Sequence, residues 1–372
     1  NDVFKTAILE QLKEVFRYME SEDLSFVKAE ILNFCKNQEI KRAIMDSVAL
    51  LKMGNYDEIK SNIDSAMKAG VDTDVGLEYK DQVGIRYNEA ARHTITTGWD
   101  VIDDLMDGGL APGELGVVMA PAGIGKSWLL INIAANAVKA GKTVIHYTLE
   151  LNQNYVGQRY DSVLTGIPAQ NLKNYQEDIE EKMKTIAGEL IIKYYPTKST
   201  GVMGIKAHIE KSAMLGKPPD LVIVDYADLL KVNNKKDKHE ALEELYEDLR
   251  GMAGEYEIPV WTASQAGRAS LEDDIIEADK IAASYGKVMV SDFLMSLSRK
   301  VEDKLSGTGR GHVIKNRFGP DGITLPSKIN TNNGQFEFFE PQTTQGKQTT
   351  QIMKTGESMI KKSLAQKFKD LG

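Results

Sequence analysis

The sequence predicts an α/β fold whose central part is a parallel, doubly wound sheet. Two observations support this class. Short apolar runs typical of buried strands alternate with segments of helical periodicity, and a glycine-rich stretch separates the first run from the helix after it. Strands joined by helical crossovers pair in parallel. We expect strands at residues 115–120, 143–150, 190–195, 220–226, 259–265, 291–300 and 309–317, and helices at 126–141, 153–164, 177–187, 204–215 and 239–256.

Four regions follow from the composition along the chain. Residues 1–71 form a helical N-terminal region, because apolar side chains recur at helical spacing and no proline interrupts them. Residues 72–93 are a polar connector, and residues 94–340 are the α/β domain. Residues 341–372 begin as a low-complexity polar linker and end in a basic amphipathic tail helix. The tail is either a flexible end or a docking helix, and both readings stay open at this point.

Composition excludes several classes of protein. The 372 residues hold one cysteine, Cys35, so no internal disulfide can form and a reducing compartment, the cytoplasm, is expected. No apolar run is long enough to span a membrane. The five histidines are scattered, and we expect no zinc site. A net charge of -8 excludes a wholly basic nucleic-acid coat, although a local basic channel remains compatible with it.

The stretch "ELGVVMAPAGIGKSWLL" at residues 114–130 has the pattern of a phosphate-binding loop. Glycines let backbone N–H groups approach the phosphates, and the helix N-terminus behind them favours anions. Lys126 can reach the β- and γ-phosphates, and the Ser127 hydroxyl can coordinate Mg²⁺. Ala120 stands where the usual pattern has its first glycine. The expected nucleotide-binding residues are Ala122, Gly123, Ile124, Gly125, Lys126, Ser127, Trp128 and Asp225.

Three further polar residues end neighbouring strands of the expected sheet. Asp225 closes "LVIVD" and is the second expected Mg²⁺ ligand beside Ser127. Glu150 closes "HYTLE" and could align the attacking water as a general base. Gln265 closes "WTASQ" and could sense the γ-phosphate. The sequence therefore predicts an enzyme that hydrolyses ATP with Mg²⁺ as its cofactor.

These motifs carry a resemblance to a known family. "TGWDVIDDLMDGGLAPGEL", "APAGIGKS", "YTLEL", "VIVDYADLL", "SQAGR" and "IKNRFGPDG" occur in the order seen in RecA-fold replicative helicases. The chain most resembles the DnaB type and, within it, T-even-like bacteriophage helicases, over residues 94–339. The resemblance implies that residues 94–340 are a RecA-like ATPase motor domain that unwinds duplex DNA at the replication fork.

The same resemblance implies an assembly and partners. Such helicases form hexameric rings with ATP sites between subunits and move on single-stranded DNA in the 5′ to 3′ direction. Lys315 and Arg317 match the pair that the family projects into the neighbouring subunit's site, with Arg317 as the arginine finger. Asp228 departs from the family, which often has Gln there. A primase and a helicase loader are expected partners, and the cytoplasm of a phage-infected bacterium is the expected location.

Two loops are expected to contact DNA. They are "KVNNKKDKHE" at residues 231–240 and "ADKIAASYGKVMVSD" at residues 278–292. Small residues and lysines allow backbone and phosphate contacts that do not depend on base sequence. The lysine run in the first loop could equally be a solvated turn. The expected DNA-binding residues are Lys235, Lys236, Ser284, Gly286 and Lys287.

Two other functions share this fold class. A RecA-type recombinase has the same loop, but "KNRFGPDG" argues against it. A regulatory or loader-type ATPase could keep the loop without unwinding DNA. The presence of both Glu150 and Arg317 favours a competent hydrolase instead.

Overall fold

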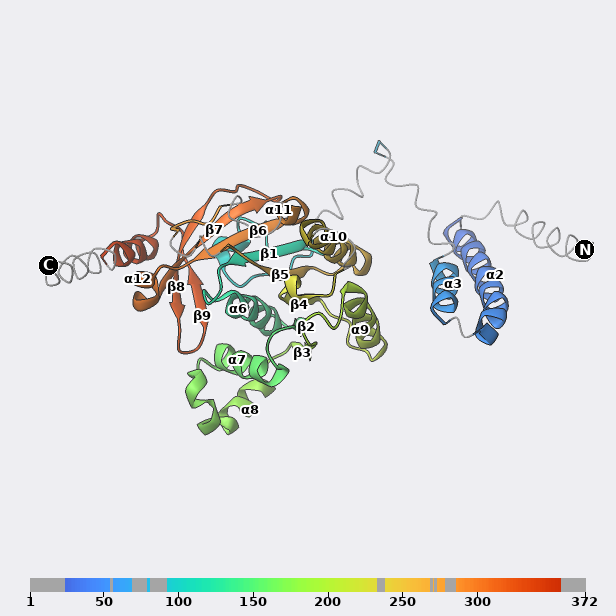
Figure 1. Cartoon of the computed structure of the whole chain (residues 1–372), viewed down its shortest axis with the longest axis horizontal. Coiled ribbons are helices and arrows are strands. Elements are labelled where there is room, and N and C mark those ends of the chain that lie inside the picture. The colour runs from blue at the N-terminus through green and yellow to red at the C-terminus, as the bar shows by residue number, and fades with distance from the viewer. Residues whose placement is uncertain are drawn as a thin grey trace, which may run out of the picture. The chain divides into compact units, whose positions relative to one another are not determined.

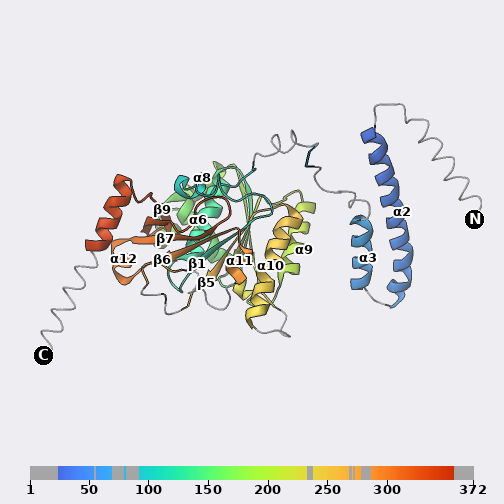
Figure 2. The same cartoon turned by 90° about the horizontal axis from the view of Figure 1, so that it is seen from above.

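The computed structural model describes residues 24–53, 56–68, 79–80, 92–232, 238–267, 270, 273–277 and 286–355. The chain separates into two compact units, residues 1–90 and 91–372 (Figure 1, Figure 2). Most of the predicted connector and the predicted tail-helix stripe lie outside the described residues.

The described residues of the first unit form two helices that pack together, α2 (Leu24–Met53) and α3 (Tyr56–Lys68). Ala43 on α2 and Ala66 on α3 are both buried. Small side chains at such positions let helix backbones approach closely. Ser47 is also buried, and its hydroxyl donates to the carbonyl of Ala43 at 2.6 Å, which satisfies it within the helix. The helical prediction for this region holds over these residues.

The second unit is built on a nine-stranded sheet with the order β3-β2-β4-β5-β1-β6-β7-β8-β9. The first six strands in that order pair in parallel, and β6 to β9 pair antiparallel. This confirms the predicted RecA-like α/β core and adds an antiparallel extension to it. The strands are β1 (Leu115–Ala120), β2 (Thr143–Thr148), β3 (Glu189–Tyr194), β4 (Leu221–Asp225), β5 (Val260–Gln265), β6 (Phe293–Ser298), β7 (Thr308–Asn316), β8 (Thr324–Asn330) and β9 (Gln335–Phe338).

Helices cover both faces of the sheet, as a doubly wound fold requires. The side chains of β1 alternate: Leu115, Val117 and Met119 join the core under α9 and α10, whereas Val118 and Ala120 join the core under α6 and α7. Among its described residues, this unit has the helices α5 (Asp100–Asp103), α6 (Lys126–Lys139), α7 (Gln153–Thr165), α8 (Gln176–Lys184), α9 (Val202–Met214), α10 (Lys238–Tyr256), α11 (Gly286–Val290) and α12 (Val301–Ser306), a helical segment at 344–355, and the short 3₁₀ turns η1 (Ala169–Asn174) and η2 (Ala227–Leu229).

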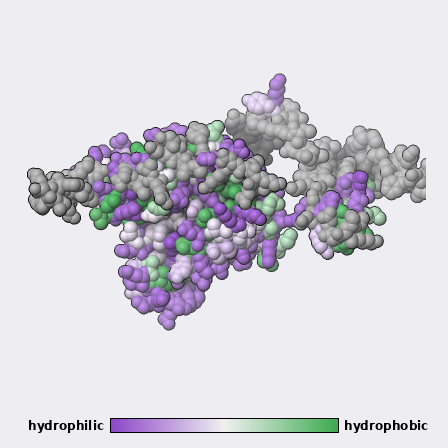
Figure 3. Space-filling model, in the orientation of Figure 1, coloured by the Kyte–Doolittle hydropathy of each residue, from purple (hydrophilic) through white to green (hydrophobic). Residues whose placement is uncertain are grey.

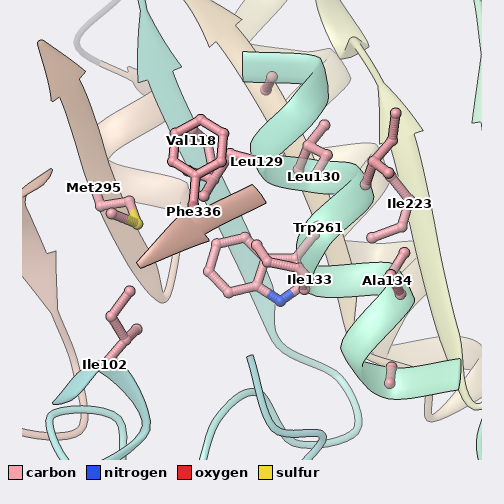
Figure 4. Close-up of a cluster of buried hydrophobic side chains, with 14 of the residues drawn as sticks. Ile102, Val118, Leu129, Leu130, Ile133, Ala134, Ile223, Trp261, Met295 and Phe336 are labelled. Carbon is pink, nitrogen blue, oxygen red and sulfur yellow. The ribbon is translucent and has the colours of Figure 1, made fainter. Parts of the chain in front are cut away.

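Helix α6 is fixed against the sheet by its apolar side chains. Leu130, Ile133 and Ala134 belong to one buried cluster with Ile223 and Trp261 of the strands beneath (Figure 4). Burying each large aliphatic side chain contributes about 1.5–3 kcal/mol relative to leaving it exposed. Because α6 begins at the end of the glycine-rich stretch, this packing also fixes where that stretch lies.

The segment after the sheet differs from the prediction. Residues 344–355 are helical, although the sequence predicted a polar linker over "PQTTQGKQTTQ" at residues 341–351. Thr349 and Met353 are buried, and the hydroxyls of Thr349, Thr350 and Thr355 donate to carbonyls one turn earlier. The threonine bonds satisfy these hydroxyls without strengthening the helix, so tertiary burial of Thr349 and Met353 is what outweighs a composition poor in strong helix formers.

The visible face of the described residues is mostly polar (Figure 3). On the face shown in Figure 3, hydrophilic side chains predominate over the coloured atoms and apolar ones are scattered. Exposed apolar residues of α9 and its end include Met203, Met214 and Leu215. In the part of the chain that the structure describes, no helix has the length and apolar character needed to cross a membrane.

Candidate active site at the carboxyl edge of the sheet

The glycine-rich stretch is a five-residue loop between β1 and α6. Gly123 and Gly125 have φ angles of 75° and 121°, a region that L side chains rarely adopt. A Cβ on Gly125 would also lie 3.1 Å from the ring of Phe336. Ile124 is buried and holds the loop to the core, while Ala122 and Gly123 are exposed. The loop therefore presents its backbone to solvent where the sequence predicts phosphate binding.

Lys126 and Ser127 begin α6 as predicted. The Lys126 ammonium donates to the carbonyls of Ala120 at 3.0 Å and Pro121 at 3.3 Å. Burial lowers the pKa of Lys126, and the nearby carboxylates of Asp225 and Glu150 oppose that shift. The ammonium thus rests on neutral loop carbonyls, which a phosphate would displace readily because it offers a full negative charge.

The sheet register brings the predicted strand-end residues together. Thr148 of β2 pairs with Asp225 of β4, and Ala120 of β1 pairs with Gln265 of β5. The carboxyl ends of these four adjacent strands therefore meet at one edge of the sheet, which is where ligands bind in open parallel sheets. Glu150 follows β2 by two residues and is exposed at this edge.

Asp225 and Ser127 form a pair of adjacent oxygen donors. The Ser127 hydroxyl donates to Asp225 Oδ1 at 3.2 Å. Asp225 is 4% exposed, and burial raises its pKa to about 6; the hydrogen bond from Ser127 and the charge of Arg159 oppose the shift. Mg²⁺ prefers oxygen ligands and is usually held by one or two protein groups together with substrate phosphates. This donor set fits a magnesium nucleotide.

Arg159 is a residue of this site that the sequence did not reveal. It lies on α7, and its guanidinium carbon is 4.9 Å from the centre of the Trp128 ring. Burial lowers the pKa of Arg159, and the charges of Asp225 and Glu150 counteract that effect. Arg159 therefore supplies a fixed positive charge beside both carboxylates. In the sequence, an arginine of a helix that faces a binding site cannot be distinguished from an arginine of a helix that faces solvent.

Lys315 and Arg317 lie at the opposite edge of the sheet. Lys315 donates to the carbonyls of Val288 and Met289, both at 2.7 Å. Arg317 donates to Asp292 Oδ1 at 2.8 Å, and Asp292 Oδ2 accepts the backbone N–H of Leu115 at 2.9 Å. Leu115 begins β1 and the phosphate loop follows its end. At about 3.3 Å per residue, the strand separates this pair from the chain's own phosphate loop by roughly 17 Å.

The predicted DNA-binding residues have different outcomes. Lys235, Lys236 and Ser284 lie outside the described residues. Gly286 and Lys287 begin α11 and are buried. Lys287, expected at a DNA-facing surface, is 1% exposed and its ammonium donates to Asp228 Oδ1 at 2.8 Å. This corrects the surface placement: the carboxylate of Asp228 draws the lysine inward, and a DNA phosphate could reach it only if that ion pair opened.

Comparison with known proteins agrees with this geometry. Residues 94–277 match the family described as DnaB-like helicase C terminal domain. The chain carries a DnaB-like helicase C-terminal domain. This confirms the predicted family and class of enzyme, an ATPase of the helicase family. The chain is similar to the DnaB-like replicative helicase of Enterobacteria phage T4, with 23% identity over 324 residues that cover 83% of this chain and 67% of the relative.

Further relatives and structures extend the comparison. The replicative DNA helicase DnaB of Geobacillus stearothermophilus is 27% identical over 208 residues, 53% of this chain and 45% of the relative. The chain thus spans only about half of that bacterial relative. One solved structure, of an ATPase domain, has the same fold, with a TM-score of 0.61 and 19% identity over 71% of this chain and 99% of that one. A DnaB-like replicative helicase, solved in a study of its interactions with primase, gives a TM-score of 0.67 with 16% identity over 87% and 80% of the two chains.

Proposed function

We propose that this chain is the motor of an ATP-driven, Mg²⁺-dependent replicative DNA helicase that encircles and moves along single-stranded DNA as a hexameric ring, in the 5′ to 3′ direction. The phage relative supports a replicative role. The residues assigned to ATP hydrolysis are Lys126, Ser127, Glu150, Asp225 and Gln265, and Arg317 with Lys315 act on the neighbouring subunit's ATP.

One observation carries this proposal. The hydrolytic residues meet at the carboxyl edge of the sheet, whereas Arg317 lies beside Leu115, at the other end of β1. Across roughly 17 Å of strand, an arginine side chain cannot reach its own chain's phosphate loop. If Arg317 stabilises the transition state, it must do so for another copy, so hydrolysis requires an assembly in which the carboxyl edge of one copy meets the opposite edge of the next.

Within this proposal, each site residue has a physical role. Backbone N–H groups of the loop and the Lys126 ammonium would hold the phosphates, and Ser127 with Asp225 would hold Mg²⁺, which neutralises charge on the phosphate oxygens. Glu150 would align the attacking water. The positive charge of Arg159 would offset the repulsion between the carboxylates of Asp225 and Glu150.

The proposal extends to partners and setting. The fold neighbour studied with primase supports a primase as a partner, and a helicase loader is the second. The similarity to a phage T4 protein supports a phage-encoded protein that works in the cytoplasm of a bacterial host.

A strand-separation assay tests the function. The full chain is incubated with ATP, Mg²⁺ and one of two short duplexes. In one duplex a strand extends as a single-stranded tail at its 5′ end, and in the other a strand extends at its 3′ end. The proposal predicts ATP-dependent unwinding of the substrate that permits 5′ to 3′ movement, DNA-stimulated ATP hydrolysis, and neither activity in Lys126→Ala. Strand exchange without unwinding, or hydrolysis that DNA does not affect, would contradict it.

A further inference from the structure

The short helix α11 is held at its start by a largely buried ion pair, in which the Lys287 side chain is 1% exposed and that of Asp228 is 16% exposed. Lys287 donates to Asp228 Oδ1 at 2.8 Å and to the Ser264 hydroxyl at 3.0 Å, and its ammonium lies 5.2 Å from the ring centre of Tyr246. Taking both charges out of water consumes much of what their attraction contributes, so such a pair is weak evidence for a purely stabilising role. This pair therefore calls for an explanation other than stability.

Asp228 connects that pair to the strand end at the ATP site. Its Oδ2 accepts the backbone N–H of Gln265 and the hydroxyl of Ser264, each at 3.4 Å, and its Oδ1 also accepts from the Tyr246 hydroxyl at 3.1 Å. Gln265 pairs with Ala120, the residue at which the phosphate loop begins. The carboxylate that holds Lys287 is therefore hydrogen-bonded to the backbone of the strand end beside the phosphate loop.

The other side of α11 is tied to the strand that carries the proposed finger. The Lys315 ammonium donates to the carbonyls of Val288 and Met289, both at 2.7 Å. Two residues after the helix, Asp292 holds the Arg317 guanidinium at 2.8 Å. The helix also packs against α10 (Figure 1, Figure 2). Because it is held on both sides, α11 is expected to move as a rigid unit.

We propose that Lys287 is a positioning residue that couples the chain's own ATP site to the Lys315–Arg317 strand serving the neighbouring site. Asp228 and α11 are the connecting parts: Gln265 moves Asp228, the ion pair moves Lys287, and α11 carries the displacement to the carbonyls that Lys315 holds. The proposal rests on the proposed function, in which Arg317 acts on another copy. It also gives a role to Asp228, which replaces the Gln often found there in the resembling family.

The test uses Lys287→Met in the full chain, because Met keeps the length of the side chain and removes its charge. Two quantities are measured: the affinity for a fluorescent ATP analogue, and the ATP-concentration dependence of hydrolysis with and without single-stranded DNA. We expect the affinity to stay within about twofold of wild type, the maximal rate to fall by about fivefold or more, and the Hill coefficient for ATP to fall to about 1, since coupling between sites is lost.

Measuring cooperativity without DNA separates this role from a lost DNA contact. The control is Lys206→Met, which breaks a 2.6 Å ion pair with Glu255 between α9 and α10 and should change neither quantity. If Lys287→Met does not fold, Asp228→Asn keeps the shape of the acceptor and should show the same loss of cooperativity.

The outcomes separate this inference from the proposed function. A wild type without cooperativity, variants that keep it, or a parallel loss of affinity and rate would overturn the coupling role. The proposed function is tested independently by mixing Arg317→Ala with Lys126→Ala: restored hydrolysis there, together with full cooperativity in Lys287→Met, would leave the function standing and remove the inference alone.

Discussion

Replacing Asp292 by Asn should destabilise the second unit and release the proposed finger. Asp292 is almost fully buried and accepts three kinds of donor: the Arg250 guanidinium through two bonds of 3.0 Å, Arg317 at 2.8 Å, and the Leu115 N–H at 2.9 Å. With its oxygen in the place of Oδ2, an Asn side chain can still accept from the Leu115 N–H and from Arg250 Nε. Its amide nitrogen, in the place of Oδ1, cannot accept from Arg317 or from the second Arg250 nitrogen, and the side chain carries no charge to balance the two arginines.

The expected loss in the free energy of unfolding follows from how deeply Asp292 and each of its arginine partners are buried. Removing one partner of a buried ion pair costs about 3–5 kcal/mol. The partners here are 39% and 44% exposed at the side chain, so water recovers part of their hydration and the expected loss is reduced to about 2 kcal/mol. Arg317→Ala removes one half-exposed pair and leaves Asp292 paired with Arg250, so it should cost only about 0.5–1 kcal/mol.

Urea unfolding followed by tryptophan fluorescence measures this difference. The chain's three tryptophans, Trp99, Trp128 and Trp261, all lie in the second unit, so the signal reports on that unit. Asp292→Asn should lower the unfolding midpoint clearly more than Arg317→Ala does. Equal midpoints for the two variants would refute the reasoning, because Asp292 would then not be the shared counter-charge.

Three further predictions concern the ATP site. Burial raises the pKa of Asp225 from 3.8 to about 6, so its contribution to the stability of the unliganded chain is present below the ordinary pKa and is lost as pH rises through about 6, whereas Mg²⁺-dependent ATP binding should strengthen as pH rises through about 6. Unfolding measured from about pH 3.5 to 7 and ATP binding measured from about pH 5 to 8, each with Asp225→Asn as the control that lacks this dependence, check the sign. Gly125→Ala should weaken ATP binding by about tenfold or more, since its φ is 121° and Phe336 crowds the site; Gly251→Ala, in the open interior of α10, should bind ATP normally. Arg159→Met should move the pH midpoint of Mg²⁺–ATP binding upward, because Arg159 favours ionised Asp225, and an unchanged midpoint would argue against that role.

The parallel core was predictable because its signal is local. Runs such as Leu221–Asp225 are wholly buried and end in a polar residue, and helical segments separate them. The strands β8 and β9 mix polar with apolar residues, and β9 has only four residues, so only their hairpin pairing identifies them. The helix at 344–355 was not predicted, because it too depends on contacts distant in sequence. Tertiary burial of Met353 helps to stabilise a segment whose composition is that of a linker.

The site residues also divide into those that local sequence predicts and those that depend on distant partners. The phosphate loop is contiguous in sequence, and parallel strands end at a common edge, so Glu150, Asp225 and Gln265 could be brought together by topology alone. Arg159 and Lys287 could not, because their roles depend on partners distant in sequence. The sequence shows Lys287 beside a small-residue loop and contains no sign that Asp228 turns it inward.

Mixing two inactive variants tests the central claim, that the ATP site is shared between copies. Arg317→Ala keeps the phosphate loop and lacks the finger, and Lys126→Ala has the opposite defect. With single-stranded DNA present, each alone should hydrolyse ATP far more slowly than wild type, and the mixture should recover activity because Lys126→Ala copies lend Arg317 to intact loops. If Arg317→Ala alone hydrolyses ATP at the wild-type rate, or if the mixture stays inactive, the shared-site account is contradicted.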